Sequence, residues 1–528
     1  MMTATFAKLS GAMLTDRIDA TYYRPEYIAN EMRLRRSGLD IVPLSSLVKS
    51  GRRAVYFDTS TLEGAAAPSD WLPFLTADDF GADGFFLNLN ARRRVSPGFA
   101  ARYPNGLLRA NELLVKVKGP NQITAYNECE PDQAVLVSGT IWGALVRREC
   151  VDPYYLVTAL SSEYAATART RLRTNLNVEF LSSTDLMSLD LPLPQSKDVQ
   201  KYIGDKVRHA ARLRALTFRL DRTVLQYFDT YKGSLNGRKH SWRIEGVAID
   251  PYRINAPHYD YVVLEMLSYA RTITRLVPLR DIVADDDISG GATPLGANYG
   301  ADGVFFARVQ NVSTLRIDRS DAAYLNSDQD EELRRSRCRA NDIILTITGY
   351  PGSAAVVSEE DLPLNINQHS VRFAVKEEWY PGFVAAAINS DFGRRQVDRL
   401  AIGGTRDALD YPSVKSLLIP ESPRSDRQRI DNLVEVSNRA LRCAGRLTMA
   451  AKMLVEALIE GRISEAELIS AQQSLERGDE ECDRAVLSRL TQAGADVADK
   501  PGLFPDLDAL YEAIEDSQRT ETCNGDAT

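Results

Sequence analysis

The segment RANELLVKVKG at residues 109–119 recurs 230 positions later as RANDIILTITG at residues 339–349. All eleven positions agree in identity or in residue type. Towards the end of each copy apolar and polar residues alternate, which is typical of a β-strand with one buried face. A repeat this widely spaced is far too long for a solenoid. It therefore predicts a domain that occurs twice in the chain.

Three further motifs recur in the same order around this strand. They are residues 17–23 (RIDATYY), which return as 253–259 (RINAPHY), residues 42–48 (VPLSSLV), which return as 277–283 (VPLRDIV), and residues 191–194 (LPLP), which return as 417–420 (LLIP). The offset falls from 236 to 226 along the chain, so only short insertions in the first copy are needed.

A long amphipathic helix is predicted after each copy. The first covers residues 196–232 and ends before Gly233, and the second covers residues 425–460 and ends before Gly461. Apolar residues recur every three or four positions and form one stripe along each helix. At 1.5 Å per residue each helix is roughly 50 Å long. The stripes favour packing of the two helices against each other as an antiparallel pair. The alternative is that each helix packs only against its own body.

The sequence thus predicts an α+β chain with two repeated bodies, two long antiparallel helices and a C-terminal helical, acidic extension. The predicted boundaries are 1–195 for the first body, 196–233 for the first helix, 234–250 for a linker, 251–424 for the second body, 425–463 for the second helix and 464–528 for the extension. Two similar bodies held at a fixed separation suit a long, stiff ligand, and duplex DNA is the obvious candidate.

The charge of the chain is unevenly distributed. The whole chain has a net charge of −8, which by itself argues against nucleic acid. Residues 465–528 carry 16 acidic and 5 basic side chains, whereas residues 1–464 carry 56 and 59. The main body is therefore mildly basic at +3, and the acidity lies in the extension at −11.

Several function classes leave no signature in the sequence. Six cysteines without a C-x-x-C pair argue against a zinc ribbon and indicate ordinary thiols in a reducing cytoplasm. No apolar run reaches the roughly 18 residues of a membrane span. There is no P-loop, no G-x-S-x-G motif, no Asn-Pro-Pro-Tyr sequence and no metal-ligand spacing among the four histidines. We therefore expect no catalytic residue, metal site or cofactor in this chain.

Polar and basic side chains gather at equivalent places in both copies. On the repeated strand, Val115 and Val117 are expected to face the core, as are Leu345 and Ile347 in the second copy, while the lysines and threonines between them face outward. Arg, Asn, Gln and Thr are side chains that hydrogen-bond base edges and phosphates. The candidate DNA-binding residues are Arg92, Arg93, Lys116, Lys118, Asn121, Gln122, Arg171, Arg173, Asn175 and Asn177 in the first copy, and Thr346, Thr348, Tyr350, Asn367, Gln368, His369, Arg372, Arg399, Thr405 and Arg406 in the second. The alternative is that they are ordinary solvated loops.

These features resemble the DNA-specificity subunit of type I restriction-modification systems, or of a related phage-defence methyltransferase complex. The resemblance covers about residues 12–463 and rests on the paired openings, the strands ending in Gly119 and Gly349, the Pro-Leu-Pro and Ile-Pro ends, and the helix starts that carry Gln200 and Gln428. Individually these motifs are loose, but their duplicated order is specific.

The resemblance implies two target-recognition domains, each of which reads one half of a bipartite duplex DNA target. The two conserved helices would set the length of the unread spacer between the halves. It further implies two modification subunits, adenine-N6 methyltransferases that bring S-adenosylmethionine, with a motor-nuclease restriction subunit as an optional further partner. Half-sites one helical turn apart are roughly 34–36 Å apart, which suits helices of this length.

The chain departs from this resemblance after Gly461, where it continues for about 65 residues. Phe504, Leu507, Leu510, Tyr511 and Ile514 are spaced for one face of a short helix. The extension is either a solvated tail, a docking peptide for another subunit or an acidic shield against DNA.

Two competing functions remain open at the level of sequence. One is a self-contained nuclease or modification enzyme with an unrecognised site, and the other is a scaffold that binds only protein.

Overall fold

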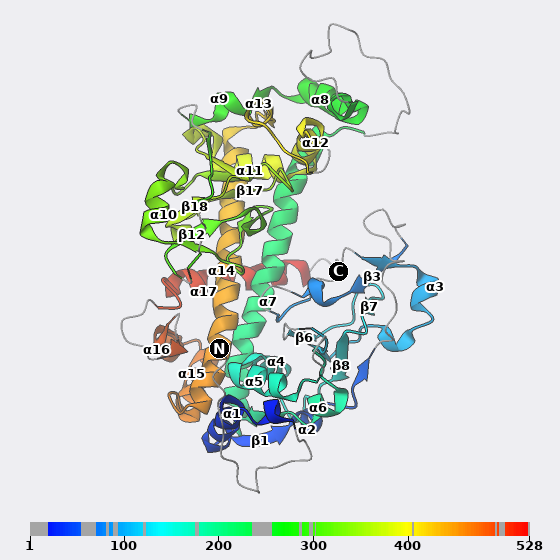
Figure 1. Cartoon of the computed structure of the whole chain (residues 1–528), viewed down its shortest axis with the longest axis vertical. Coiled ribbons are helices and arrows are strands. Elements are labelled where there is room, and N and C mark those ends of the chain that lie inside the picture. The colour runs from blue at the N-terminus through cyan, green and yellow to red at the C-terminus, as the bar shows by residue number, and fades with distance from the viewer. Residues whose placement is uncertain are drawn as a thin grey trace. The chain divides into compact units, whose positions relative to one another are not determined.

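The computed structural model describes residues 19–53, 70–80, 84–87, 93–119, 123–174, 179–234, 256–284, 288–294, 299–300, 302–403, 406–491, 494–495 and 502–525 (Figure 1). The chain divides into two compact units. Unit 1 comprises residues 1–214 and 441–528, and unit 2 comprises residues 215–440. Both units mix helices with short strands, as the sequence predicts.

Unit 1 contains a four-stranded and a three-stranded sheet. The four-stranded sheet has the order β2 (Arg52–Arg53), β8 (Ile141–Leu145), β5 (Glu112–Lys116) and β6 (Thr124–Asn127), with antiparallel neighbours. The three-stranded sheet has the order β4 (Arg94–Val95), β3 (Leu72–Leu75) and β7 (Leu136–Val137), in which β3 and β7 are parallel. The repeated sequence motif thus forms the central strand β5.

Unit 2 is built on the same plan. Its four-stranded sheet has the order β11 (Ser289–Gly290), β19 (Ser370–Phe373), β16 (Ile343–Thr346) and β17 (Ala354–Val356). Its three-stranded sheet has the order β15 (Tyr324–Leu325), β12 (Val304–Ala307) and β18 (Leu364–Ile366), in which β12 and β18 are parallel. The strand order and directions of unit 1 therefore recur in unit 2.

Helices and outer strands repeat in the same way. A short antiparallel pair joins β1 (Asp40–Pro43) to β9 (Asp190–Leu193) in unit 1 and β10 (Leu276–Pro278) to β20 (Leu418–Pro420) in unit 2. Two consecutive helices, α4 (Pro153–Ser161) and α5 (Glu163–Leu172), correspond to α11 (Pro381–Asn389) and α12 (Asp391–Leu400). Each unit also has an opening helix, α1 (Pro25–Arg36) or α8 (Tyr261–Ile273).

The repeated motif begins and ends with the same backbone conformations in both units. Asn111 and Asn341 precede the strand at φ values of 56° and 68°, and Gly119 and Gly349 follow it at 90° and 86°. Asparagine and glycine tolerate this left-handed region better than other residues do. The motif therefore encodes a turn, a strand and a second turn.

The expectation that Thr346 faces solvent is wrong, because β16 is covered on both faces. Ile343 and Leu345 join an apolar cluster that includes residues of α11 and α12. Ile344 lies in a second cluster, together with Phe305 of the three-stranded sheet. Thr346 is only 1% exposed. A sheet between helices and another sheet has no solvent face, so the alternation in the sequence does not report exposure here.

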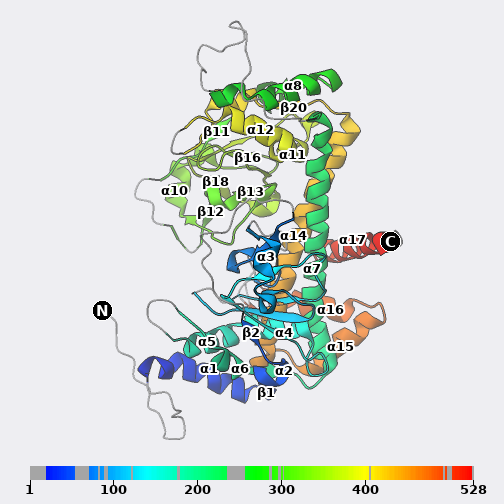
Figure 2. The same ribbon diagram turned by 90° about the vertical axis from the view of Figure 1, so that its right-hand side faces the viewer.

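The two long helices closely match their predicted ranges. Helix α7 covers Lys197–Gln226 and continues as the 3-10 turn η6 (Tyr227–Tyr231), and helix α14 covers Arg424–Ile459. Within unit 2 the Thr217 hydroxyl donates to the Ser437 carbonyl (3.2 Å), and the Tyr227 hydroxyl donates to Asp426 (3.1 Å). The later residue of the first segment, Tyr227, contacts the earlier residue of α14, Asp426, so these stretches run antiparallel. Figure 2 shows the two helices from a second side.

The described part of the C-terminal extension is folded rather than a solvated tail. It forms α15 (Glu465–Glu476), α16 (Glu481–Ser488), the small hairpin β21 (Leu490–Thr491) and β22 (Gly494–Ala495), and α17 (Leu507–Gly525). Leu510 and Ile514 of the predicted stripe are buried in α17. The extension is therefore a structured part of unit 1.

No helix among the described residues is both long enough and apolar enough to cross a membrane.

Candidate functional site

Fourteen of the twenty candidate residues can be located in the structure. The other six lie outside the described residues: Arg92, Asn121, Gln122, Asn175, Asn177 and Thr405.

The pairing of β16 with β19 brings distant candidates of unit 2 together. The strands are antiparallel with Thr346 opposite Ser370, so the chain leaving β16 lies beside the chain entering β19. The Ile347 amide donates to the His369 carbonyl (2.8 Å). On the other side, Thr348 forms a β-bridge with Ala408. Residues far apart in the sequence therefore meet at one end of the sheet. We call this surface the unit 2 edge; it consists of Thr348, Tyr350, Gln368, His369 and Arg406.

The unit 2 edge combines hydrogen-bonding groups with an exposed aromatic ring. Tyr350 is 83% exposed, and Gln368 and Arg406 are exposed as well. The Gln368 amide lies 3.3 Å from the His369 imidazole, and Thr293 donates a hydrogen bond to Gln368. Such a set of amide, imidazole, guanidinium and phenol can bind base edges, phosphates and base faces.

The turn that carries Tyr350 is held by buried polar groups. The Thr346 hydroxyl donates to the Tyr350 carbonyl (2.8 Å) and accepts from the Ser353 amide (2.9 Å). The guanidinium of Arg394 donates to the Pro351 carbonyl (2.9 Å). Thr346 thus supports the exposed turn from below and does not itself reach solvent. The turn presents an aromatic side chain to solvent on a fixed backbone.

Asn367 and Arg372 are also buried, in contrast to the expectation that they contact DNA directly. The Asn367 carbonyl oxygen of the side chain accepts from the His369 amide (3.2 Å). Arg372 donates to Asp342 (3.4 Å) and to the Arg335 carbonyl (3.2 Å). Their polar groups are engaged inside unit 2, so we assign them to support of the edge.

Arg171 and Arg399 occupy matching places and bind matching partners. The Nε of Arg171 donates to the Tyr22 carbonyl (2.9 Å), and the Nε of Arg399 donates to the His258 carbonyl (2.6 Å). Tyr22 and His258 are themselves equivalent residues of the repeated opening motif. Each arginine therefore ties its opening segment to the second helix of its body. This internal role is repeated in both units, so the sequence pattern alone overstated their availability to DNA.

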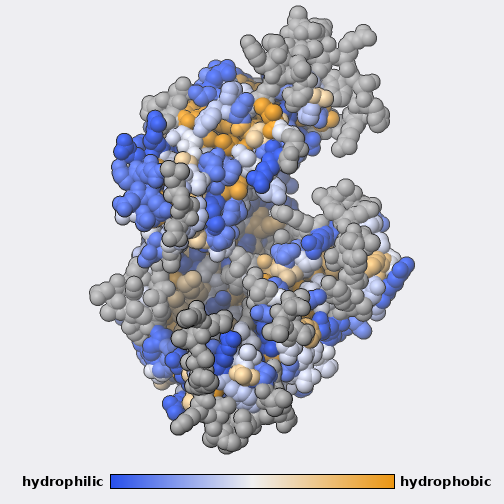
Figure 3. All heavy atoms as spheres, viewed as in Figure 1, coloured by the Kyte–Doolittle hydropathy of each residue, from blue (hydrophilic) through white to orange (hydrophobic). Residues whose placement is uncertain are grey.

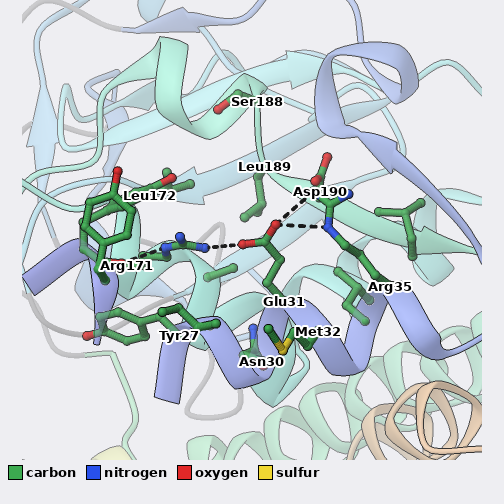
Figure 4. Close-up of a pocket in the computed structure, with 16 residues that line it drawn as sticks. Tyr27, Asn30, Glu31, Met32, Arg35, Arg171, Leu172, Ser188, Leu189 and Asp190 are labelled. Carbon is green, nitrogen blue, oxygen red and sulfur yellow. Dashed lines mark hydrogen bonds and ion pairs between the residues drawn. The ribbon is translucent and has the colours of Figure 1, made fainter. Parts of the chain in front are cut away.

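A cavity of about 530 Å³ lies beside Arg171 in unit 1 (Figure 4). Its wall contains an ion-pair cluster in which Glu31 binds Arg171 (2.7 Å) and Arg35 (2.9 Å). Burial alone would raise the pKa of Glu31, but hydrogen bonds from the two guanidinium groups lower it below its ordinary value. Asp190, also at the wall, has a pKa raised by burial. The charges facing the cavity are thus largely paired with one another.

Unit 1 has an edge equivalent to that of unit 2, at the end of β5. The Val117 amide donates to the Thr140 carbonyl (3.0 Å), and Lys118 forms a β-bridge with Phe180. Arg173 forms an ion pair with Glu179. Lys116 also lies here, because a side chain added at Gly119 would meet its Cε at 3.6 Å. We call this surface the unit 1 edge; it consists of Arg53, Lys116, Lys118, Thr140 and Arg173.

Two members of the unit 1 edge, Arg53 and Thr140, were not among the candidates predicted from the sequence. Arg53 lies 4.9 Å from the ring centre of Phe180, and its guanidinium donates to the Gly139 carbonyl (2.9 Å). The dipeptide Arg52-Arg53 was the available signal, but only strand pairing places it beside β8. The candidate Arg93 forms an ion pair with Asp78 (3.8 Å).

Surface polarity differs between parts of unit 2. Figure 3 shows hydrophobic side chains gathered over the region in which Figure 1 labels α11 and α12. Ile402, which follows α12, is 45% exposed. Hydrophilic side chains cover α10 (Ser327–Glu332), which exposes Asp328, Glu331 and Glu332. Like charges repel, so the acidic α10 face is unsuited to a phosphate backbone.

Arg169, in the same basic run as Arg171, is fully buried, and burial lowers its pKa to about 9. Its Nη2 donates to the Leu160 carbonyl (2.8 Å). The equivalent residue of unit 2 is the buried Val397. Since an unpaired buried charge is unfavourable, we expect Arg169→Met to raise the free energy of unfolding by about 1–4 kcal/mol. Denaturant unfolding measures this.

Arg171→Met is the matched control for that experiment, because it removes bonds to Tyr22 and Glu31 and should destabilise the protein. If Arg169→Met destabilises the protein as much as Arg171→Met does, the guanidinium of Arg169 is stabilising and the prediction is wrong.

Comparison with known proteins supports the class of protein inferred from the duplication. No protein-family model matches the chain. The chain is similar to a type I restriction specificity subunit. This relative is the type I restriction enzyme EcoBI specificity subunit of Escherichia coli, 23% identical over 273 residues. The match covers 49% of this chain and 54% of the relative, so the chain spans about half the length of the curated relative it matches. The relative confirms the resemblance stated from the sequence.

Two solved structures are also similar to this chain, at low sequence identity. The type I restriction-modification S subunit from M. genitalium has 13% identity and a TM-score of 0.38, and 81% of this chain covers 97% of it. The HsdS subunit from Thermoanaerobacter tengcongensis has 14% identity and a TM-score of 0.25 at the same coverages.

Proposed function

We propose that the chain is a non-catalytic DNA-specificity subunit that recognises a bipartite duplex target and directs partner adenine methyltransferase subunits to it. The observation that carries this proposal is the duplicated sheet edge. The two units place hydrogen-bonding and cationic side chains at the same end of the same strand, but with different residues. Lys118 of the unit 1 edge, for example, corresponds to Thr348 of the unit 2 edge. One scaffold with two different edges suits the reading of two different short sequences.

In this proposal the bodies of units 1 and 2 are the two target-recognition domains. The long helices α7 and α14 act as the element that sets the unread spacer. S-adenosylmethionine is held by the partner methyltransferase, for which two copies are proposed, and a restriction subunit is an optional further partner. Similarity to the EcoBI specificity subunit supports the proposal that this chain is a specificity subunit.

The test of the proposal is a genome-wide map of methylated adenines in cells with and without this gene. A bipartite motif methylated only when the gene is present is expected. The same set of methylated sites in both strains would contradict the proposal.

The unit 2 edge yields a quantitative prediction. In the complex with its methyltransferase, Arg406→Ala is expected to weaken binding to the methylated motif by about 1–3 kcal/mol, or roughly 5- to 150-fold in Kd, because a base or phosphate contact is lost. Binding is measured by titration of labelled duplex at fixed salt. Arg271→Ala, which removes the same charge from an exposed position of α8, is the control. Equal effects of the two substitutions would remove Arg406 from the interface.

The enzyme hypothesis is tested separately. Among the described residues no group of three or more His, Cys, Asp or Glu side chains is arranged to hold a metal ion. We expect the chain alone, incubated with duplex DNA, magnesium and S-adenosylmethionine, neither to cut nor to methylate. Either product would show that the chain has an active site of its own.

A further inference from the structure

Each body reaches the long helices through an equivalent hairpin. In unit 1, Phe80 forms an antiparallel bridge with Leu87, and in unit 2 β13 (Val312–Ser313) pairs with β14 (Arg316–Ile317). Both hairpins directly follow a 3-10 turn closed by a capping box, at residues 76–79 and 308–311. The residue before the second bridging position is Phe86 in unit 1 and Arg316 in unit 2. These two residues therefore occupy the same place in the repeat.

Arg316 enters a polar network that joins the body of unit 2 to both helices. Its guanidinium forms an ion pair with Asp221 of α7. It also donates to the side chains of Asn438 (2.8 Å) and Ser437 (3.2 Å) of α14. The Ser437 hydroxyl in turn donates to Asp221 (2.7 Å). The hairpin, α7 and α14 are thus linked through the Arg316 side chain, which is only 15% exposed.

The hairpin of unit 1 contacts the same two helices with opposite chemistry. The guanidinium of Arg214, on α7, lies 4.6 Å from the ring centre of Phe86. The ammonium of Lys452, on α14, lies 4.9 Å from the ring centre of the buried Phe85. Here the hairpin supplies aromatic rings and the helices supply the cations.

The Arg316 network of unit 2 and the Phe85 and Phe86 contacts of unit 1 differ in how strictly they fix the position of each body on the helices. A planar guanidinium that donates through both terminal nitrogens, as Arg316 does to Asn438 and Asp221, binds its partners only in a narrow geometry, whereas the attraction between a cation and a ring face extends to about 6 Å from the ring centre. The network in unit 2 also lies in an apolar setting, since Leu216, Val224 and Val434 of the two helices are buried. A single polar group in an apolar helix contact is known to fix register.

We propose that Arg316 is a positioning residue that fixes the second reading body on α7 and α14 and thereby sets the length of unread spacer DNA that the complex accepts. This inference rests on the proposed function. The hairpin of unit 1, with Phe85 and Phe86, holds the first body less strictly. The proposal concerns position along the helices, so the bases read in each half-site are unaffected by Arg316.

The experiment uses the full complex with its methyltransferase and a panel of duplexes that carry both half-sites with the native spacer, one base pair less or one more. The unaltered complex is expected to methylate the native spacing best. In the complex that carries Arg316→Met, the preference for the native spacing should fall by roughly tenfold. Discrimination against altered half-site bases should be retained. Phe86→Leu, at the equivalent place in unit 1, is the matched control and should keep the spacing preference.

The outcomes separate the two proposals. An unchanged spacing preference in Arg316→Met overturns the role of Arg316. Failure of the unaltered complex to distinguish cognate from altered half-sites overturns the proposed function instead. If Arg316→Met does not fold, Ser437→Ala removes one hydroxyl from the network and leaves the ion pair with Asp221. An unchanged preference in Ser437→Ala then overturns the proposal, and a weakened preference supports it.

Discussion

Asp483→Ala is expected to lower the free energy of unfolding of unit 1 by about 3–5 kcal/mol, because it leaves a buried ammonium without its counterion. The Asp483 side chain is 3% exposed, and Oδ1 lies 2.5 Å from the Lys206 ammonium and 2.5 Å from the Tyr202 hydroxyl. Oδ2 accepts a hydrogen bond from Tyr511 of α17. One carboxylate therefore joins α7 to both α16 and α17. Denaturant unfolding at pH 7 measures the loss.

The pH dependence of stability gives a second measurement of the same contact. Burial alone would raise the pKa of Asp483, but the Lys206 charge and the hydrogen bonds of Lys206, Tyr202 and Tyr511 lower it below its ordinary value of 3.8. A carboxyl with a lowered folded pKa stabilises the protein above its unfolded pKa, and this contribution disappears as the pH falls through the folded pKa. We therefore expect the unaltered protein to lose stability below about pH 4 more steeply than Asp483→Asn does.

The exposed ion pair between Lys201 and Glu476 is the matched control, since it also joins α7 to the extension. Its two side chains are about half exposed, and exposed ion pairs contribute little to stability. Glu476→Ala should therefore have a much smaller effect than Asp483→Ala. Equal effects would mean that the buried carboxylate does not hold the extension. The double variant Lys206→Met, Asp483→Leu should recover most of the lost stability, because it removes both charges.

The extension also shows what the sequence could not predict. The apolar spacing from Phe504 to Ile514 indicated the helix α17, but α15 and α16 were not predicted. Asp483 is an acidic residue in an acidic segment, and a pattern of hydrophobicity assigns such a residue to solvent. Its burial depends on Lys206, which lies 277 residues earlier. A contact of this kind between distant charges has no periodic signal.

The fold was more predictable than the site, and the reason is physical. The repeated strand and the two long helices follow from periodicity, and their observed bounds differ from the predicted ones mainly at the end of α7. Residue type indicated which side chains can bind DNA, and strand pairing does bring Tyr350, Gln368 and Arg406 to one exposed edge. Residue type did not indicate which arginines already have partners inside the protein. Arg171 and Arg399 bind backbone carbonyls, as the structure alone shows.

Glu112 and Asp342 are the equivalent acidic residues of the repeated motif, so the two copies can be compared within one protein. Glu112 is buried, and its two oxygens accept from Arg52 Nε (2.7 Å) and Nη2 (2.6 Å). The equivalent Asp342 is also buried, but Arg372 lies 3.4 Å from a single oxygen. Burial raises the pKa of Asp342 even though hydrogen bonds and nearby arginines lower it. The charge of the Glu112 carboxylate is thus balanced by two bonds from Arg52, whereas Asp342 has a single, longer contact with Arg372.

Glu112→Ala is therefore expected to destabilise unit 1 by about 3–5 kcal/mol, because the Arg52 guanidinium, whose side chain is only 14% exposed, loses its bidentate counterion. Asp342→Asn should be nearly neutral for unit 2, since an amide replaces a carboxylate that burial already disfavours. Hydrogen exchange resolved along the chain measures the two units separately in each variant, with Glu112→Gln as the matched substitution. If Glu112→Gln and Asp342→Asn change exchange protection equally, the bidentate pairing of Arg52 does not distinguish the two copies.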